Sequence, residues 1–286
     1  MTVFLHGPNW SGKKLVEGEI SHLATKQEIS VKVGSLFSGI GGLDLGLERV
    51  GMDIVWQCEI NPYARKVLKK HWSDIPCYED VKKIDERVQR PEVLCGGFPC
   101  QDVSFAGKRA GLHEGTRTGL WFEFARIIRC LRPRYVLLEN VPGLLSLGFG
   151  RVLGDLAEIG YDAEWQVLSA AQFELPHKRE RVFVVAYPTS NRRDNVFNKA
   201  PDYATMQGIQ DYKQPGYRWE RKNGGHSMES VGWTIKPEIR GGDDGLPIKL
   251  DTVDRLKCLG NAVVPLIAQY LGGLIQEHVK GKQNDN

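Results

Sequence analysis

From Val31 onward, short apolar runs rich in β-branched residues alternate with stretches of helical periodicity. This alternation predicts an α/β fold with a mostly parallel, doubly wound sheet. The predicted strands are Val31–Phe37, Ile54–Cys58, Val93–Cys95, Tyr135–Leu138 and Arg181–Tyr187. The predicted helices between them are Gly42–Val50, Pro62–His71, Leu120–Leu131 and Phe149–Ile159. A chain of 286 residues can bury such a core and still carry a small appended domain.

The periodicity stops after Tyr187, and this change predicts the domain boundaries. Residues 188–254 are rich in Gly, Asn, Asp, Arg and aromatic residues, which favours a small irregular domain. A disordered tail is the alternative, but the segment carries apolar anchors and is followed by a helix with one apolar face, at 264–279. We therefore expect a polar extension at 1–30, a first domain at 31–187, the irregular domain at 188–254, and a return to the first domain at 255–286.

Composition excludes several classes of protein. Net charge is only +3, so nucleic-acid binding rests at most on local clusters such as Lys178–Arg181. We expect no apolar run that approaches the roughly 20 residues needed to span a bilayer. The amino terminus also lacks the pattern of a signal peptide. The lack of both patterns favours a cytoplasmic location. The six cysteines form no C-x-x-C pair, so we expect free thiols and no metal site.

Ligands of open α/β sheets bind beyond the carboxyl ends of the strands, so the residues that follow each strand indicate the chemistry. The first predicted strand is followed by the glycine-rich turn 38–42. The second is followed by Glu59, which is placed to bind ribose hydroxyls. This pair favours a nucleoside cofactor, although a glycine turn can also serve packing alone. The turn is not G-x-G-x-x-G, which disfavours NAD.

Three further strand ends carry reactive groups. Cys100 lies in a Gly- and Pro-constrained loop suited to a nucleophile, and Glu139 follows the next strand. Arg179 and Arg181 alternate before the last predicted strand, so their side chains can share one face. A lone cysteine or arginine pair is ordinary, but their convergence on one sheet edge predicts a catalytic site.

These segments resemble the C5-cytosine-specific DNA methyltransferase family, in the order of its motifs, over 31–187 and from Arg255 onward. The similar segments are FSGIGGLDLGL (37–47), EINPYA (59–64), GGFPCQDVSFAG (96–107), TRTGLWFEFARI (116–127), LLENVPGLL (137–145), LPHKRERVFVVA (175–186) and LGNAVVP (259–265). Two positions depart from the family pattern. His177 replaces the usual glutamine, and Glu92 replaces a common aspartate.

The resemblance implies a class I, Rossmann-like methyltransferase that uses S-adenosylmethionine, releases S-adenosylhomocysteine and needs no metal. It implies that Cys100 adds to C6 of a flipped cytosine while Glu139 hydrogen-bonds N3 and the amine. Arg179 and Arg181 would favour the thiolate, and Arg181 would hold O2. The implied cofactor-binding residues are Phe37, Gly39, Gly41, Glu59, Ile60, Asp80, Val81, Pro99, Leu120, Asn261 and Ala262.

The resemblance also implies double-stranded DNA as partner, with 188–254 as a short target recognition domain. We expect a monomer with no membrane partner, and leave a cognate restriction endonuclease open as a separate protein. The alternatives are a tRNA cytosine-5 methyltransferase of the same fold and a catalytically silent DNA-binding relative. A third alternative is a nucleotide-hydrolysing module at Gly7–Lys14, where Lys14 replaces the hydroxyl of the P-loop pattern.

Overall fold

The structure is a computed structural model that describes residues 30–99, 119–173, 175, 178–191, 196–197, 221–222, 225–226 and 248–284. The chain divides into two compact units, Met1–Ser30 and Val31–Asn286, and the described residues after Ser30 belong to the second. The near-match to a P-loop at Gly7–Lys14 lies outside the described residues.

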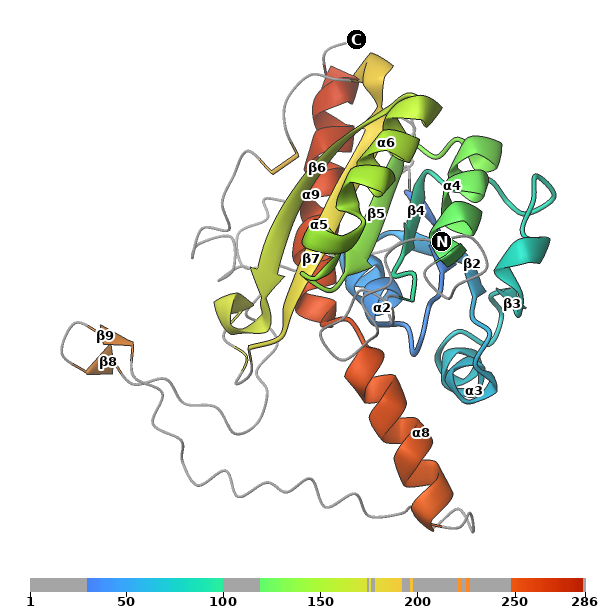
Figure 1. Cartoon of the computed structure of the whole chain (residues 1–286), viewed down its shortest axis with the longest axis vertical. Coiled ribbons are helices and arrows are strands. Elements are labelled where there is room, and N and C mark those ends of the chain that lie inside the picture. Colours follow the sequence, from blue (N-terminus) through green and yellow to red (C-terminus); the bar gives the residue numbers. More distant parts are fainter. Residues whose placement is uncertain are drawn as a thin grey trace, which may run out of the picture. The chain divides into compact units, whose positions relative to one another are not determined.

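The second unit is built on a seven-stranded sheet in the order β3-β2-β1-β4-β5-β7-β6. Its strands are β1 (Lys32–Leu36), β2 (Asp53–Cys58), β3 (Cys77–Tyr78), β4 (Val93–Gly96), β5 (Tyr135–Asn140), β6 (Tyr161–Ser169) and β7 (Glu180–Pro188). The first five are paired in parallel, and β7 runs antiparallel to both β5 and β6 (Figure 1). The predicted mostly parallel, doubly wound fold is confirmed.

The main helices either lie between these strands in the chain or, at its carboxyl-terminal end, follow the last of them (Figure 1). They are α2 (Gly42–Arg49), α3 (Pro62–His71), α4 (Leu120–Leu131), α5 (Leu144–Leu147), α6 (Phe149–Ile159), α8 (Ile248–Asn261) and α9 (Pro265–Asn284). Short 3-10 turns lie at η1 (Val81–Lys83), η3 (Ala170–Phe173) and η4 (Thr189–Asn191). Within the expected irregular domain, β8 (Arg221–Lys222) and β9 (Gly225–His226) form a small antiparallel pair.

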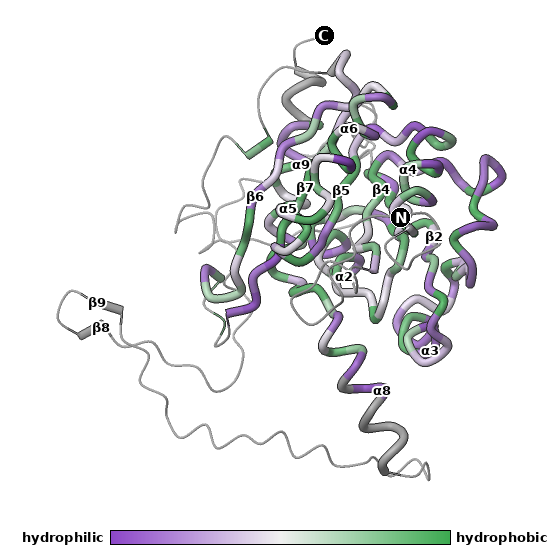
Figure 2. The backbone as a smooth tube through the Cα atoms, in the orientation of Figure 1, coloured by the Kyte–Doolittle hydropathy of each residue, from purple (hydrophilic) through white to green (hydrophobic). Residues whose placement is uncertain are grey.

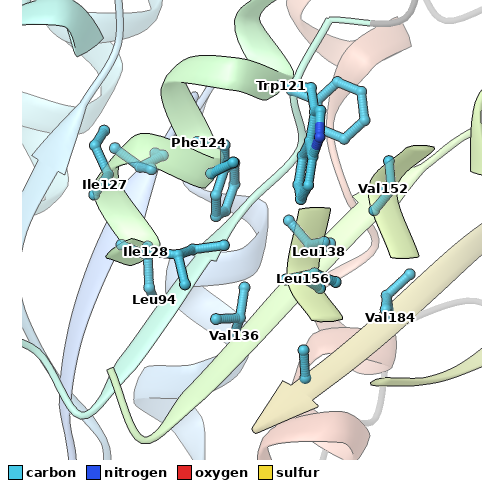
Figure 3. Packing of buried hydrophobic residues seen from close by; sticks show 14 of the residues in the cluster. Leu94, Trp121, Phe124, Ile127, Ile128, Val136, Leu138, Val152, Leu156 and Val184 are labelled. Carbon is cyan, nitrogen blue, oxygen red and sulfur yellow. The ribbon is translucent and has the colours of Figure 1, made fainter. Parts of the chain in front are cut away.

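Each face of the sheet is covered by its own apolar core. Alternate residues of a strand point to opposite faces, so Val136 and Leu138 of β5 pack under α4 and α6. Figure 3 shows this cluster. Tyr135 and Leu137 of the same strand join the second cluster, which α2 and α9 cover. Figure 2 shows the apolar residues gathered in the central strands, as a sheet buried on both faces requires.

Two strands of the seven-stranded sheet, the small β8–β9 pair and two helices were not expected from the sequence. β3 has only two residues, and β6 is an edge strand with mixed polar and apolar residues whose side chains are half-buried, so neither shows a clear apolar run. α5 is a single turn. α8 begins at Ile248 and therefore runs across the expected domain boundary between Asp254 and Arg255.

The expectation that no apolar segment is long enough to span a bilayer is wrong. The helical stretch Lys257–Val279 meets that criterion by length and composition. Its apolar residues include Ile267, Leu271 and Ile275, which are buried in the core between α9 and the sheet. The hydrophobicity of this stretch is therefore used in packing inside the fold.

α9 packs against α2 at van der Waals distance because α2 carries glycine where the two helices meet. A Cβ atom placed on Gly46 would lie 2.4 Å from both Ala268 Cβ and the Pro265 carbonyl oxygen. A Cβ atom on Gly42 would lie 2.3 Å from the carbonyl oxygen of Val263, in the link between α8 and α9. Any side chain at these positions would push the carboxyl-terminal helix away from the sheet.

We predict that Gly46→Ala lowers the free energy of unfolding by about 1–3 kcal/mol, because the added methyl group overlaps backbone that cannot move aside. Gly154→Ala is the matched control, since a Cβ there meets nothing within 4 Å and alanine favours the helix by up to about 1 kcal/mol. Urea unfolding of both variants measures the difference. Equal stability of the two would contradict the close helix contact.

Candidate active site

In the turn after β1, one glycine is packed against a neighbouring side chain and another faces open space. Gly39 and Gly41 adopt positive φ angles of 56° and 83°, which glycine tolerates best, and Phe37 also has a positive φ, of 52°. A Cβ on Gly41 would lie 2.4 Å from the Trp72 ring, whereas a Cβ on Gly39 would meet nothing within 4 Å. Gly41 therefore serves packing, and Gly39 is where a ligand can approach the backbone.

Glu59 links this turn to the end of β2. Its Oε2 accepts a hydrogen bond from the Gly39 amide at 2.8 Å, and its Oε1 accepts one from the Asn61 amide, also at 2.8 Å. The next side chain, Ile60, is apolar yet 75% exposed. A carboxylate beside an exposed apolar side chain suits a nucleoside, which has a polar sugar and a flat apolar base.

Two other segments expected at the cofactor site approach the same edge of the sheet. Asp80 caps η1 by accepting a hydrogen bond from the Lys82 amide at 3.0 Å, and its charge is one of the causes that raise the pKa of Cys58 at the end of β2. Burial raises the pKa of the Cys258 thiol on α8, and the charge of Glu59 raises it further. Geometry agrees, since α8 ends at Asn261 and the nearby Val263 carbonyl oxygen would lie 2.3 Å from a Cβ on Gly42, at the end of the glycine turn.

Glu139 is the centre of the second half of the site. It lies inside β5, one residue before the strand ends, because the strand runs two residues further than the sequence predicts. Its side chain is buried, and its Oε1 lies 3.0 Å from Nε of Arg181. Burial raises the pKa of this carboxyl, while the charges of Arg181 and Arg179 oppose the rise. The register explains the pair, since Phe183 on β7 lies opposite Glu139 and Arg181 projects to the same side two residues away.

Arg179 brings a second guanidinium to this place. Burial lowers its pKa, and the charge of Arg181 lowers it further. Its Nε and Nη2 atoms are buried and have no hydrogen-bond partner among the described residues. Buried donors are costly unless an acceptor satisfies them, so this side chain is suited to an acceptor that a bound ligand supplies.

Cys100, the predicted nucleophile, lies outside the described residues, as do His177 and the loop after Cys100. The described base of its loop packs directly against Glu139 and Asn140. A Cβ on Gly97 would lie 2.6 Å from Glu139 Oε2, and the Phe98 carbonyl oxygen accepts a hydrogen bond from Asn140 Nδ2 at 3.1 Å. The meeting of Cys100 with Glu139 stays a prediction, and the approach of its loop to Glu139 supports it.

The cysteines that the structure describes are poorly suited to act as nucleophiles. Burial is the first cause that raises the thiol pKa at each of them, which disfavours the reactive thiolate. They are Cys58, Cys77, Cys95, Cys130 and Cys258. Over the described residues, no three His, Cys, Asp or Glu side chains are grouped so that they could hold a metal ion.

A buried polar network under the glycine turn was missed by the sequence analysis. Asp44 on α2 accepts hydrogen bonds from Ser35 Oγ at 3.1 Å and from Gln57 Nε2 at 2.8 Å. Ser38, in the turn itself, donates to Ser35 Oγ at 2.9 Å. The signal in the sequence is polar residues at inward-facing positions of β1, β2 and α2, where apolar residues are the rule.

Comparison with known proteins gives the class of this fold and site. The sequence profile of the C-5 cytosine-specific DNA methylases matches residues 31–230. The chain belongs to this family. Its glycine turn, Glu139 and arginine pair all lie inside the matched range.

Curated relatives are bacterial type II methyltransferases. The chain is 33% identical over 215 residues to M2.BsuMI of Bacillus subtilis, which covers 71% of this chain and 54% of the relative. It is 34% identical over 219 residues to M1.ScrFI of Lactococcus lactis subsp. cremoris, covering 74% and 52%. The chain thus spans about half the length of the curated relatives it matches.

Solved structures agree on the fold. One is described as a candidate DNA modification methyltransferase encoded within an E. coli prophage, with a TM-score of 0.50, 25% identity, and coverage of 58% of this chain and 49% of that chain. The DNMT2 of Spodoptera frugiperda also has a TM-score of 0.50, at 23% identity, covering 60% and 56%, and shows the fold alone.

We predict that Asp44 makes stability depend on pH. Burial raises its pKa from 3.8 to about 6, so the folded protein binds the proton more tightly than the unfolded chain. The free energy of unfolding should therefore rise as the pH falls from about 6 to about 4, by up to about 3 kcal/mol. Asp44→Asn cannot titrate and should lose this rise.

Urea unfolding of wild type and Asp44→Asn across that pH range measures the effect, and their difference cancels the titration of all other groups. Parallel pH curves for the two proteins would show that Asp44 does not hold its proton in the folded state.

Proposed function

We propose that this chain is a DNA (cytosine-5-)-methyltransferase that uses S-adenosylmethionine to methylate C5 of a cytosine flipped out of duplex DNA. The observation that carries the proposal is the buried carboxyl of Glu139, held by Arg181 beside the base of the Cys100 loop. Family membership over residues 31–230 and the type II methyltransferase relatives support it.

The glycine turn and the end of β2 fit the cofactor. The open side of Gly39, the carboxylate of Glu59 and the exposed side chain of Ile60 are the groups that would hold it. The further residues proposed to line this site are Phe37, Gly41, Asp80, Val81, Pro99, Leu120, Asn261 and Ala262. When bound, S-adenosylmethionine supplies an electrophilic methyl group on a sulfonium.

Glu139 activates the pyrimidine in this mechanism. Burial raises the pKa of this carboxyl, which favours its protonated form, and the carboxyl is proposed to hydrogen-bond N3 of the cytosine and to protonate it as a nucleophile adds to C6. Arg181 fixes the carboxyl in place through its Nε, and the same guanidinium is proposed to hold O2 of the base. Because the Glu139–Arg181 pair is buried, the two side chains hold each other in a fixed orientation before the substrate binds.

Cys100 is the proposed nucleophile. Its thiolate sulfur bonds to C6, the electron pair of the C5–C6 double bond forms a C4–C5 double bond, and the pair of the C4–N3 double bond takes the proton from Glu139 at N3. C5 is then an enamine carbon that can bond to the methyl group, with S-adenosylhomocysteine as the leaving group. Removal of the C5 proton then re-forms the double bond and expels the thiolate. The neighbouring charges of Arg179 and Arg181 favour the thiolate, which is the reactive form of cysteine.

The substrate is proposed to be double-stranded DNA. A stacked base cannot reach this site, so the cytosine must be flipped out at a cost of a few kcal/mol. We propose the domains 1–30, 31–187, 188–254 and 255–286, with 188–254 as the target recognition domain and its carboxyl-terminal boundary inside the continuous helix α8. The named relatives are bacterial type II methyltransferases, which supports a cytoplasmic location. A monomeric state is proposed from the family resemblance alone, and a cognate restriction endonuclease stays open as a separate protein.

We predict that the protein forms a covalent adduct with duplex DNA in which 5-fluorocytosine replaces every cytosine, when S-adenosylmethionine is present. Fluorine at C5 blocks the final proton loss, so the Cys100–C6 bond persists and shifts the protein on a denaturing gel. Full replacement removes the need to know the recognition sequence. Cys100→Ala should abolish the adduct, and Glu139→Gln should slow it on the order of 100-fold.

An adduct that survives in Cys100→Ala would overturn the nucleophile, and no adduct with wild type would overturn the reaction. Adducts with 5-fluorocytosine tRNA in place of DNA would favour the alternative function as a tRNA methyltransferase. Expression in a bacterium without cytosine methylation, followed by bisulfite sequencing, then identifies the methylated sequence.

A further inference from the structure

A carboxylate lies inside the apolar core between the sheet and α6. Asp155 on α6 is 6% exposed, and its Oδ2 accepts a hydrogen bond from the indole Nε1 of Trp121 at 2.7 Å. Its Oδ1 accepts one from Arg151 Nε at 2.8 Å, and the Arg151 side chain is largely exposed. A buried carboxylate is costly where apolar residues would fill the same space, so stability alone is a poor reason for Asp155.

Trp121 connects this carboxylate with the loop that carries the proposed nucleophile. It lies at the start of α4 and is fully buried, and Figure 3 shows it beside Phe124 in the core. Its ring centroid lies 5.5 Å from that of Phe98, two residues before Cys100. Phe98 is held on the other side by the hydrogen bond from Asn140 to its carbonyl oxygen. The Trp121 ring and Asn140 therefore hold Phe98, which lies two residues before the proposed nucleophile in the chain.

The same rings reach the proposed cofactor turn. Trp121 stacks on Phe124 with centroids 6.1 Å apart, and Phe124 lies 6.3 Å from Phe37, the residue with positive φ that begins the glycine turn. A ring that is turned or shifted at Trp121 would thus disturb both Phe98 and Phe37, because close-packed cores transmit displacement.

We propose that Asp155 is a positioning residue for methyl transfer: its hydrogen bond to Trp121 fixes the indole ring against Phe98 and Phe124, and so sets Phe98, two residues before Cys100 in the chain, relative to Phe37 at the cofactor turn. This inference rests on the proposed function of the site. It assigns no contact with substrate to Asp155 or Trp121. A small misplacement of reacting groups can cost as much as ~100-fold in rate.

Trp121→Phe is the first test, and Trp56→Phe is its matched control. Trp56 is buried in the same core cluster and its Nε1 donates to the Gln89 carbonyl oxygen at 2.7 Å, so both changes remove one buried indole hydrogen bond. No ring contact joins Trp56 to Phe98 or Phe37 among the described residues, where its neighbour is Tyr78. We expect Trp121→Phe to slow the adduct with 5-fluorocytosine duplex DNA about ten-fold or more, and Trp56→Phe to stay within about two-fold.

Changes at Asp155 separate the hydrogen bond from the charge. Asp155→Asn keeps an oxygen acceptor for the Trp121 indole and should retain the wild-type rate of adduct formation. Asp155→Ala removes the acceptor and should slow the reaction as much as Trp121→Phe. Arg151→Ala leaves the Trp121 bond in place and should react like wild type.

Each variant is also measured for thermal stability and for the concentration of S-adenosylmethionine that gives half the maximal rate. If Asp155 has a positioning role, the maximal rate should fall more in Trp121→Phe and Asp155→Ala than in the control Trp56→Phe, even where the control is destabilised to the same extent. Rates that follow stability alone across all the variants would overturn the inference. Absence of the adduct in wild type would instead overturn the proposed function, so the two failures can be told apart.

Discussion

The burial of Glu139 beside Arg181 is the constraint on which the rest of the site depends. A carboxylate in this apolar strand end needs a hydrogen-bonded cation, and β7, running antiparallel to β5, delivers one at the required register. The same antiparallel strand places Arg179 next to the pair. The antiparallel strand β7 therefore brings both arginines to the acid at this edge of the sheet.

Close contact between backbone segments is the second feature that shapes the site. Glycine at positions 42, 46 and 97 lets α9, the link after α8 and the Cys100 loop approach at distances that any Cβ would prevent. These contacts bring the carboxyl-terminal segment against the turn after β1, so that residues more than two hundred positions apart in the chain share one edge of the sheet. The proposed cofactor site is therefore built from both ends of the second unit.

Buried polar groups support the two halves of the site from behind. Asp44, Ser35 and Gln57 lie under the glycine turn, and Asp155 lies behind the Trp121 ring. Hydrogen bonds in such networks orient side chains more strictly than apolar packing does. Burying the polar groups costs stability, and the hydrogen bonds offset this cost only in part. Polar residues inside this core therefore mark places where geometry matters more than packing.

The sequence by itself determined the fold class, the central strands and helices, and the motifs at the strand ends, because hydrophobic periodicity and glycine turns are local properties of the chain. It did not reveal β6, whose edge position leaves its side chains half-exposed, or the full length of β5, which places Glu139 inside the strand. Only the tertiary structure decided that Arg181 binds Glu139, that Gly39 is open while Gly41 is packed, and that Asp155 holds Trp121. These contacts depend on strand register and on the packing of segments far apart in the sequence. The local spacing of residues along the chain determines neither of them.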